Sequence, residues 1–421
     1  MLESLKLCDV GPAPRLELEF GSRFNVITGD NGLGKTFFLD IAWWALTRTW
    51  ARLPARPQRG PDKQPQIGFT IRGRTTTSEY VSEFDWPSQD WLGRGRGRPI
   101  NPGMVIYAQV DGGFSVWDPA RNYFRKRDGV DDLERPSAYL FSPKQVWDGL
   151  RSDGDVLCNG LIADWASWQR ESGAAFEMLR AALRRLSPGD QPLEPGGLAR
   201  LSLNDVRDHP TLAMAYGQDV LLAHTSAGMR RIVALAYLLV WTWQEHVRAS
   251  ELLNQATAPQ IVFLIDELEA HLHPRWQRLV LSAFLGVMDE LTGSQDVPVQ
   301  VITATHSPLV LASLEPLFDA KLDRLWSLDL EGQRVVLSNC PWYPRGDANS
   351  WLTSDIFELG EPRSVEAERA MQRALDLYVQ RDPDPRTIAR LDDELHRLLP
   401  ETDAFLRRWC AFRDERREAQ P

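Results

Sequence analysis

One stretch of the chain has residue types and spacing suited to holding phosphate groups. Gly29, Gly34, Lys35 and Thr36 match the pattern G-x-x-x-x-G-K-[ST]. In this pattern glycines let backbone N–H groups curl around phosphate oxygens, the lysine reaches the β- and γ-phosphates, and the threonine hydroxyl ligates Mg²⁺. We therefore expect an ATP-binding loop that uses Mg²⁺. The expected nucleotide contacts in this loop are Asn31, Gly32, Gly34, Lys35, Thr36 and Phe37.

The segments on either side of this loop are those that a phosphate-binding loop requires. Residues 24–28 are predicted to form a buried strand, and residues 36–49 a helix with a broad apolar face. Strand, glycine loop and helix in this order confirm the motif in known proteins. We favour this interpretation over the alternative, a glycine turn that precedes a core helix.

A second apolar strand, residues 261–265, ends in the two carboxylates Asp266 and Glu267. In a phosphate-loop protein, Asp266 at the strand end would hold Mg²⁺. Glu267 would be the catalytic base that positions and polarises the attacking water, which must lie within hydrogen-bond reach of it. The alternative is an acidic pair that caps the next helix.

Two further motifs place polar groups where a nucleotide could meet them. His306 follows another apolar strand, residues 298–303, and can hydrogen-bond the γ-phosphate or the attacking water as a catalytic residue. Ser226 and Gly228 begin a long apolar helix, and a helix N-terminus favours anions. The chain's own loop already holds a nucleotide, so this second site is free to contact the γ-phosphate of another subunit. A plain serine N-cap is the alternative.

The order of predicted strands and helices along the rest of the chain predicts an α/β fold. Residues 2–7 and 15–20 form a hairpin, and short strand-like runs between residues 67 and 141 suggest one antiparallel β layer. Helical spacing over residues 159–186 gives way to α/β alternation from residue 219, then a hairpin at residues 331–332 and charged helices. The expected domains are the N-terminal part of an ATPase core, a helical lobe, the C-terminal part of the core, and a partner-binding extension with the hairpin and helices: residues 1–150, 151–220, 221–320 and 321–421.

The charge, the cysteine spacing and the apolar runs of the chain exclude several classes of protein. The net charge of −10 and pI near 5.3 argue against a surface coated in basic charge. Residues 48–98 nevertheless carry ten basic and five acidic side chains, net +5, and end in an Arg-Gly run that could follow a nucleic-acid backbone or form a solvated loop. The four cysteines make no C-x-x-C, and the N-terminus has no basic and apolar leader. These features predict a cytoplasmic protein without a zinc site. The longest apolar run, residues 232–243, is too short to cross a membrane.

The order of these motifs resembles that of ABC-type ATPase heads of the SMC/RecF/OLD branch. The resemblance covers roughly residues 1–320, and the run Asp-Glu-Leu-Glu-Ala-His-Leu-His-Pro that begins at Asp266 is similar to that of OLD-like ATPases rather than transporters. The family implies a head-to-tail homodimer, or a higher even oligomer, with two ATP molecules between subunits. By position, Ser226 and Gly228 resemble the signature that contacts ATP in trans. Glu267 resembles the catalytic base, His306 the switch histidine and residues 270–273 a dimer-facing loop.

The family also uses a glutamine that links Mg²⁺ to the helical lobe. Gln145 lies just before the predicted lobe, and Gln109 ends a strand of the predicted β layer. Topology favours Gln145 as the metal-linking and nucleotide-contacting residue, with Gln109 as the alternative.

The chain departs from this family in two ways. The segment between the phosphate loop and the signature is too short for coiled-coil arms, and the 115 residues after His306 contain no strand ending in a D-x-D pair of an OLD-type nuclease. This architecture, with the tail Gly-Asp-Ala-Asn-Ser-Trp-Leu-Thr-Ser-Asp-Ile-Phe, resembles the stand-alone PtuA-type ATPases of Septu and retron anti-phage systems. Such ATPases work with a separate HNH nuclease, so we expect an effector partner. The alternatives are a RecF-like DNA-repair ATPase, a transporter ATPase subunit, and a nucleotide-gated scaffold with little turnover.

Overall fold

The computed structural model describes residues 1–94, 99–123, 125–126, 133–134, 136–293, 297–380 and 383–418. The chain divides into two compact units, Met1–Ala348 and Asn349–Pro421. The predicted hairpin after residue 320 is therefore part of the first unit, and the division lies 28 residues further on than the predicted boundary at residue 320. The end of the Arg-Gly run, residues 95–98, lies outside the described residues.

The first unit is built on an eight-stranded mixed sheet with the order β11-β8-β7-β17-β18-β3-β19-β20. Its five central strands, β7, β17, β18, β3 and β19, are parallel, so their carboxyl ends meet at one edge of the sheet. The strand that leads into the phosphate loop, β3, is separated from the two-carboxylate strand β17 by β18, which leads to His306. The strands are β3 (Phe24–Gly29), β7 (Met104–Ala108), β8 (Phe114–Trp117), β11 (Tyr139–Phe141), β17 (Ile261–Asp266), β18 (Val299–Ala304), β19 (Arg324–Glu331) and β20 (Arg334–Asn339).

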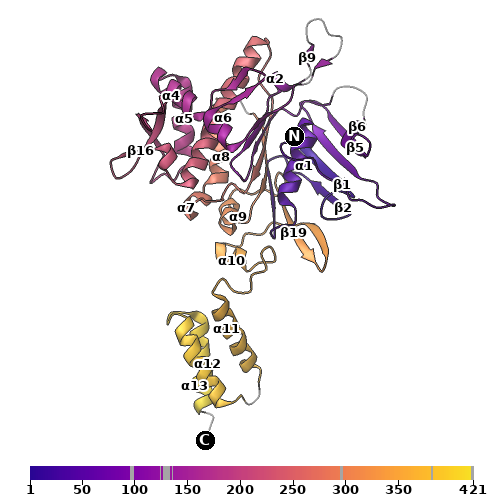
Figure 1. Cartoon of the computed structure of the whole chain (residues 1–421). Coiled ribbons are helices and arrows are strands. Elements are labelled where there is room, and N and C mark those ends of the chain that lie inside the picture. Colours follow the sequence, from indigo (N-terminus) through magenta and orange to yellow (C-terminus); the bar gives the residue numbers. More distant parts are fainter. Residues whose placement is uncertain are drawn as a thin grey trace. The chain divides into compact units, whose positions relative to one another are not determined.

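Helix α1 (Lys35–Thr47) lies between this sheet and a second, antiparallel sheet of five strands (Figure 1). Its apolar side chains surround the helix, as expected of a helix covered on both faces. Trp43 packs on Tyr107 of the main sheet with ring centroids 6.2 Å apart, and Trp44 packs on Phe69 of the second sheet at 6.0 Å. The second sheet has the order β2-β1-β4-β5-β6, formed by β1 (Leu2–Cys8), β2 (Arg15–Glu19), β4 (Gln66–Arg72), β5 (Thr77–Asp85) and β6 (Asp90–Arg94).

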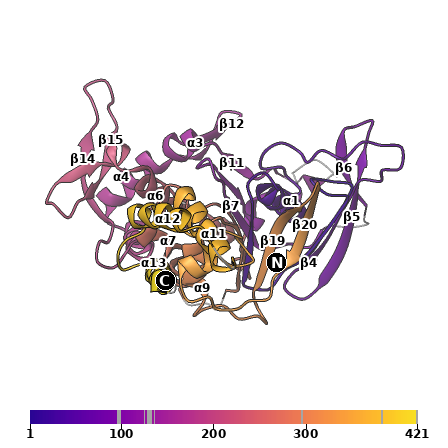
Figure 2. The same cartoon turned by 90° about the horizontal axis from the view of Figure 1, so that it is seen from below.

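Helices cover the other face of the main sheet, and a small sheet extends beyond them (Figure 2). The helical spacing predicted over residues 159–186 is confirmed by α4 and α5, and the apolar run of residues 232–243 lies in α6. A three-stranded sheet, β14-β15-β16, also belongs to this region. The helices are α4 (Leu161–Glu171), α5 (Ala174–Arg185), α6 (Ala227–Leu252), α7 (Pro274–Gln277), α8 (Val280–Thr292) and α9 (Pro308–Leu314), and the strands are β14 (Glu194–Arg200), β15 (Asp208–Ala213) and β16 (Asp219–Leu221). Short connecting elements are α2 (Pro119–Asn122), β9 (Arg125–Lys126), β10 (Leu133–Glu134), α3 (Pro143–Asp148), β12 (Leu150–Ser152), β13 (Asp155–Cys158) and the 3₁₀ turn η1 (Leu222–His224).

The predicted antiparallel β layer is present as the second sheet, but only some of the strand-like runs between residues 67 and 141 belong to it. Strands β4 and β5 pair with the N-terminal hairpin, whereas β7, β8 and β11 extend the main sheet. All five residues of β7 are buried, which is the pattern of a strand covered on both faces. Its parallel pairing with β17 brings the end of β7 to the same edge as Asp266.

The second unit is a group of helices with its own core. Its apolar side chains come from α11 (Val365–Tyr378), α12 (Pro385–Leu398) and α13 (Ala404–Glu418), and α10 (Ala348–Leu352) begins at the unit boundary. Trp409 is fully buried, and its indole Nε1 donates to the Asp392 carboxylate at 3.0 Å. Across the described ranges of both units, helices are too short or too polar to cross a membrane.

We predict that Phe263→Ala destabilises the first unit by about 3–5 kcal/mol, because large core truncations leave a cavity. Phe263 lies on the central strand β17, and its ring meets Phe284 of α8 edge-on at 4.4 Å. Chemical denaturation followed by circular dichroism measures the change. Leu203→Ala, at a fully exposed side chain, is the control and should stay within about 0.5 kcal/mol of the parent. Equal effects of the two substitutions would contradict the assigned core.

Candidate functional site

The phosphate loop has the backbone geometry that its glycines predict. Gly29, Gly32 and Gly34 have φ values of 128°, 81° and 106°, which side chains disfavour. At Gly29 an added Cβ would lie 2.1 Å from the Leu328 carbonyl oxygen, so this position requires glycine. Helix α1 begins directly after Gly34 without a side-chain cap, which leaves its first N–H groups available to an anion.

Lys35 is buried beneath this loop. Its Nζ donates to the carbonyl oxygens of Gly29 and Asp30 at 2.9 and 2.8 Å. Burial lowers the pKa of Lys35, and the nearby carboxylate of Glu267 opposes that shift. Phosphate oxygens are stronger partners for an ammonium than neutral carbonyls, so an anion in the loop would take over these hydrogen bonds.

Thr36 and Asp266 form the oxygen pair expected of a Mg²⁺ site. The Thr36 hydroxyl donates to both carboxylate oxygens of Asp266, at 3.0 and 2.9 Å. Asp266 is fully buried, and this burial raises its pKa to about 6. Mg²⁺ prefers oxygen ligands, and a cation beside this carboxylate would keep it ionised. The residues present therefore fit the metal that the motif implies.

Arg52 supports this pair from behind, and sequence reasoning missed it. Its guanidinium makes a two-oxygen contact with Asp40 at 2.9–3.1 Å and donates to the Tyr107 hydroxyl at 3.2 Å. It also lies 3.9 Å from the Asp266 carboxylate. The only sequence feature that could have drawn attention to Arg52 is its position in a segment rich in proline and arginine. The arginine thus supplies positive charge at the floor of the phosphate site.

Glu267 and His306 lie side by side at the edge of the sheet. The His306 Nε2 is 3.3 Å from a Glu267 carboxylate oxygen, and both side chains are about one-third exposed, at 30% and 33%. Glu267 has a φ of 46°, an unfavourable backbone conformation for a residue other than glycine, and such conformations are found at functional sites. Burial, followed by the charge of Lys35, lowers the pKa of His306 and favours the neutral imidazole. This pair can orient a water molecule.

These predicted residues are brought together in one cavity of about 400 Å³. The phosphate loop, Glu267 and His306 line this cavity together with Arg52. Asp266 does not line it but accepts a hydrogen bond from Thr36, which does. The cavity is lined by Asn31, Gly32, Gly34, Lys35, Thr36, Phe37, Asp40, Arg52, Glu267 and His306.

The signature residues lie outside this cavity. Ser226 caps helix α6 by accepting a hydrogen bond from the Met229 N–H at 3.3 Å, and its side chain is exposed. Gly228 is buried, and an added Cβ would lie 2.7 Å from the His271 carbonyl oxygen. The structure therefore does not join Ser226 or Gly228 to the phosphate loop of the same chain.

The structure does not place Gln145 in the phosphate site. Its side-chain oxygen accepts hydrogen bonds from the backbone N–H and hydroxyl of Ser142, in the capping box of α3. Gln109, the alternative, directly follows β7 and is buried beside β17, where Ala108 pairs with Ile265. Its amide donates to the Ser115 hydroxyl at 2.9 Å. Gln109 does not line the phosphate cavity either, and chain order alone did not reveal the pairing of β7 with β17.

Two charged residues that hold the site were not assigned a role from sequence. Arg231 of α6 donates to the carbonyl oxygens of Val110, Asp266 and Glu267 at 2.8–3.0 Å, and so ties the signature helix to the two-carboxylate turn. Glu269 is buried and accepts from the Thr305 hydroxyl at 2.6 Å and the His306 N–H at 3.0 Å. Both residues lie beside predicted site residues in the sequence: Arg231 ends Met-Arg-Arg, which follows Gly228, and Glu269 ends Asp-Glu-Leu-Glu.

Comparisons with known proteins agree with this geometry. A family model described as "AAA domain, putative AbiEii toxin, Type IV TA system" matches residues 121–312, and another, "AAA domain", matches residues 4–85. The Septu protein PtuA of Bacillus thuringiensis is 20% identical over 388 residues, which cover 89% of each chain. The retron Ec83 probable ATPase of Escherichia coli is 28% identical over 100 residues, 24% of this chain and 15% of that protein.

Solved structures of ATPase heads also match. The SMC head domain from Thermotoga maritima aligns with a TM-score of 0.38 and 14% identity, covering 81% of this chain and 99% of that one. The recombination mediator RecF aligns with a TM-score of 0.37 and 10% identity, covering 80% and 98%. The chain has an α/β fold, and its sequence is similar to that of PtuA over nearly the full length.

We predict that Arg231→Ala lowers stability by about 3 kcal/mol, because buried carbonyl groups lose their donor. Arg231→Lys keeps a cationic donor and should recover only part of this stability, because an ammonium group cannot reach all of the same carbonyl oxygens. Calorimetric unfolding measures both. The control is Arg180→Ala, which removes an exposed ion pair with Glu177 and should change stability by under about 1 kcal/mol. If Arg231→Ala behaves like Arg180→Ala, Arg231 does not fasten the two segments.

Proposed function

We propose that this chain, an ABC-type ATPase head that resembles Septu PtuA, hydrolyses ATP with Mg²⁺ as a head-to-tail dimer and regulates a separate effector. The observation that carries the proposal is the shared cavity of Lys35, Thr36, Glu267 and His306, with Asp266 bonded to Thr36. These residues come from three adjacent parallel strands and one helix start. Together they provide groups that can bind phosphate, two oxygen ligands for Mg²⁺, and two side chains that can orient a water molecule.

The chain's residues divide the work of hydrolysis among them. The loop N–H groups and Lys35 bind the phosphates, and Thr36 and Asp266 hold Mg²⁺, which stabilises negative charge on the transferred phosphoryl group when bound. Glu267 accepts a proton from the attacking water, and His306 hydrogen-bonds the γ-phosphate or that water. Glu269 fixes the His306 backbone, and Arg231 fixes the backbone of Glu267.

Gln109 is the glutamine that we propose to link Mg²⁺ to the helical side of the first unit. It is buried at the end of β7, next to the strand that carries Asp266. Its backbone carbonyl lies 3.4 Å from the Arg231 guanidinium, which comes from the signature helix. A change at the metal can therefore reach α6 through Gln109.

The position of the signature supports the proposed dimer. Ser226 is exposed at the start of a helix of 26 residues, where backbone N–H groups favour an anion, yet it does not line the phosphate cavity of its own chain. A second copy in head-to-tail orientation would place Ser226 and Gly228 against the γ-phosphate held by the first. Each ATP then joins two chains.

The effector is proposed to be an HNH-type nuclease in anti-phage defence, on the resemblance to PtuA-type ATPases. The second unit, Asn349–Pro421, is the proposed docking element. Leu375 of helix α11 and Val379, its C-cap residue, are four positions apart, with 44% and 86% of their surfaces accessible. Co-expression followed by mass measurement of the purified complex tests this partner, and a complex that survives deletion of the second unit would contradict the docking proposal.

We predict that Glu267→Gln retains ATP binding and slows hydrolysis by about 100-fold or more, because a general base contributes 10²–10⁴-fold. Phosphate release and equilibrium nucleotide binding measure the two effects separately. Lys35→Ala should instead abolish nucleotide binding. Glu401→Gln, at an exposed glutamate of the second unit, is the control and should leave both quantities unchanged. Wild-type turnover by Glu267→Gln would show that another group activates the water.

We also predict that Gln109→Ala slows hydrolysis by about 10-fold or more, as expected for a residue that supports a metal site. Gln145→Ala is the matched control, because its side chain is engaged in the α3 cap. Turnover measured over a Mg²⁺ titration distinguishes weaker metal binding from a slower chemical step. The opposite ranking of the two variants would restore Gln145 as the linking residue.

A further inference from the structure

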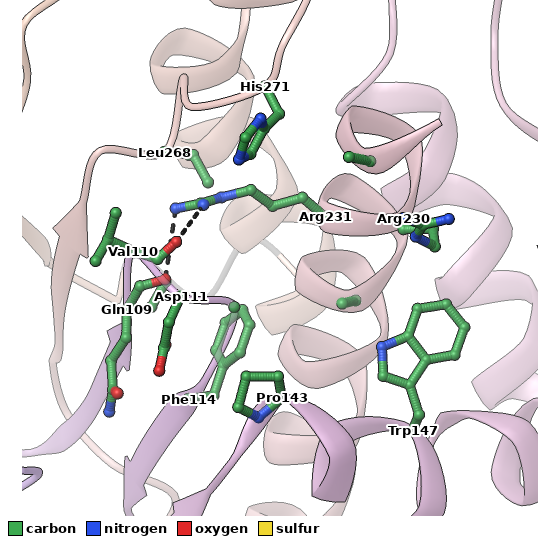
Figure 3. A pocket seen from close by; sticks show the side chains of 14 residues that line it. Gln109, Val110, Asp111, Phe114, Pro143, Trp147, Arg230, Arg231, Leu268 and His271 are labelled. Atoms are coloured by element: carbon green, nitrogen blue, oxygen red, sulfur yellow. Dashed lines mark hydrogen bonds between the residues drawn. The ribbon is translucent and has the colours of Figure 1, made fainter. Parts of the chain in front are cut away.

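A second cavity of about 400 Å³ lies beside the start of α6 and shares no lining residue with the phosphate cavity (Figure 3). The loop after β7 forms one side of it, and α3 and α6 supply Trp147 and Arg230. Its size falls within the range of small-molecule sites, about 300–1,000 Å³. Gln109 and Arg231 line it as well, but the phosphate loop, Asp266, Glu267 and His306 do not.

The cavity is positively charged at one end. Arg230 donates through Nη1 to the carbonyl oxygens of Ala223 and Thr225 at 3.1 and 2.8 Å, which anchors its guanidinium. Arg231 is bonded only to carbonyl oxygens, and within the described ranges neither arginine forms an ion pair. Among the lining residues, Asp111 alone carries a carboxylate, and one of its oxygens already accepts from the Gly113 N–H. Because Arg231 is occupied by backbone carbonyl oxygens, Arg230 is the guanidinium that favours an anionic ligand here.

An aromatic surface accompanies this charge. Figure 3 shows the flat indole of Trp147 below Arg230 on one side of the cavity, with Phe114 and Pro143 on the other. The Trp147 side chain is half-buried. Indole rings stack on nucleobases, and arginine grips phosphate through two N–H groups. A ligand with a planar ring and a phosphate group satisfies both ends of the cavity.

We propose that this cavity binds a free mononucleotide, with the base on Trp147 and the phosphate on Arg230. The site goes beyond the proposed hydrolysis and does not depend on it. Arg230 lies two residues after the signature Gly228, and His271 of the predicted dimer-facing loop also lines the cavity. If the proposed dimer forms around ATP, a bound mononucleotide would act on the segments at its interface, and this consequence alone rests on the proposed function.

The test is calorimetric titration of AMP, GMP, CMP and UMP into the full-length Lys35→Ala variant, whose phosphate loop should no longer hold nucleotide. We expect at least one of the four to bind. Arg230→Ala and Trp147→Ala, each added to Lys35→Ala, should weaken that binding by about 10-fold or more. Arg230→Lys and Trp147→Phe should retain part of it, because each keeps the charge or the ring. These milder variants also guard against loss of folding.

Matched controls are Arg180→Ala and Trp86→Phe, at side chains outside the cavity, which should leave binding unchanged. Inorganic phosphate alone should bind more weakly than the mononucleotide, because it lacks the ring. The proposal is overturned if no mononucleotide binds at millimolar concentration, or if binding is indifferent to both Arg230→Ala and Trp147→Ala. Binding of a single-stranded tetranucleotide, without binding of mononucleotides, would overturn it in favour of a nucleic-acid strand.

Discussion

The hydrogen bonds between the Thr36 hydroxyl and the Asp266 carboxylate join segments 230 residues apart, and the rest of the site depends on them. They fix the start of α1 against the end of β17. Between the two lies β18, whose end delivers His306 next to Glu267. Parallel pairing of the three strands is therefore what turns separate motifs into one cavity. The helix α1, covered by a sheet on each side, holds the loop rigid above that edge.

Charged residues surround this contact, with Arg52 on one side of Asp266 and Arg231 on the other. Asp266 is fully buried, and the cost of its ionisation appears as a raised pKa. Arg52 offsets part of that cost at 3.9 Å, and Asp40 and Tyr107 keep Arg52 in place. On the other side Arg231 holds the backbone of the carboxylate turn from the signature helix. A nucleotide and its metal would thus enter a site whose positive charge and backbone donors are already oriented.

Motifs read along the chain predicted the parts of the site that depend on local sequence. The phosphate loop, the two carboxylates and His306 each lie within a few residues of a recognisable strand, so their elements and their meeting point followed from pattern. The position of Gln109 at the sheet edge could not be predicted in this way, because it depends on β7 pairing with β17 across more than 150 residues. Strands β14 and β15 escaped prediction for a similar reason. Strand β14 contains Pro195, Gly196 and Gly197, which have low strand propensity, and it is held by its partner strand.

The central claim is that each ATP is completed by the signature of a second chain. Mixing Lys35→Ala with Ser226→Arg tests it most directly by ATP turnover. Each variant alone should be inactive. A head-to-tail mixed dimer contains one intact site, formed by Lys35 of the Ser226→Arg chain and Ser226 of the Lys35→Ala chain. The account predicts that turnover appears on mixing and rises with the fraction of mixed dimer. Turnover that stays at the sum of the separate variants at every ratio would contradict it.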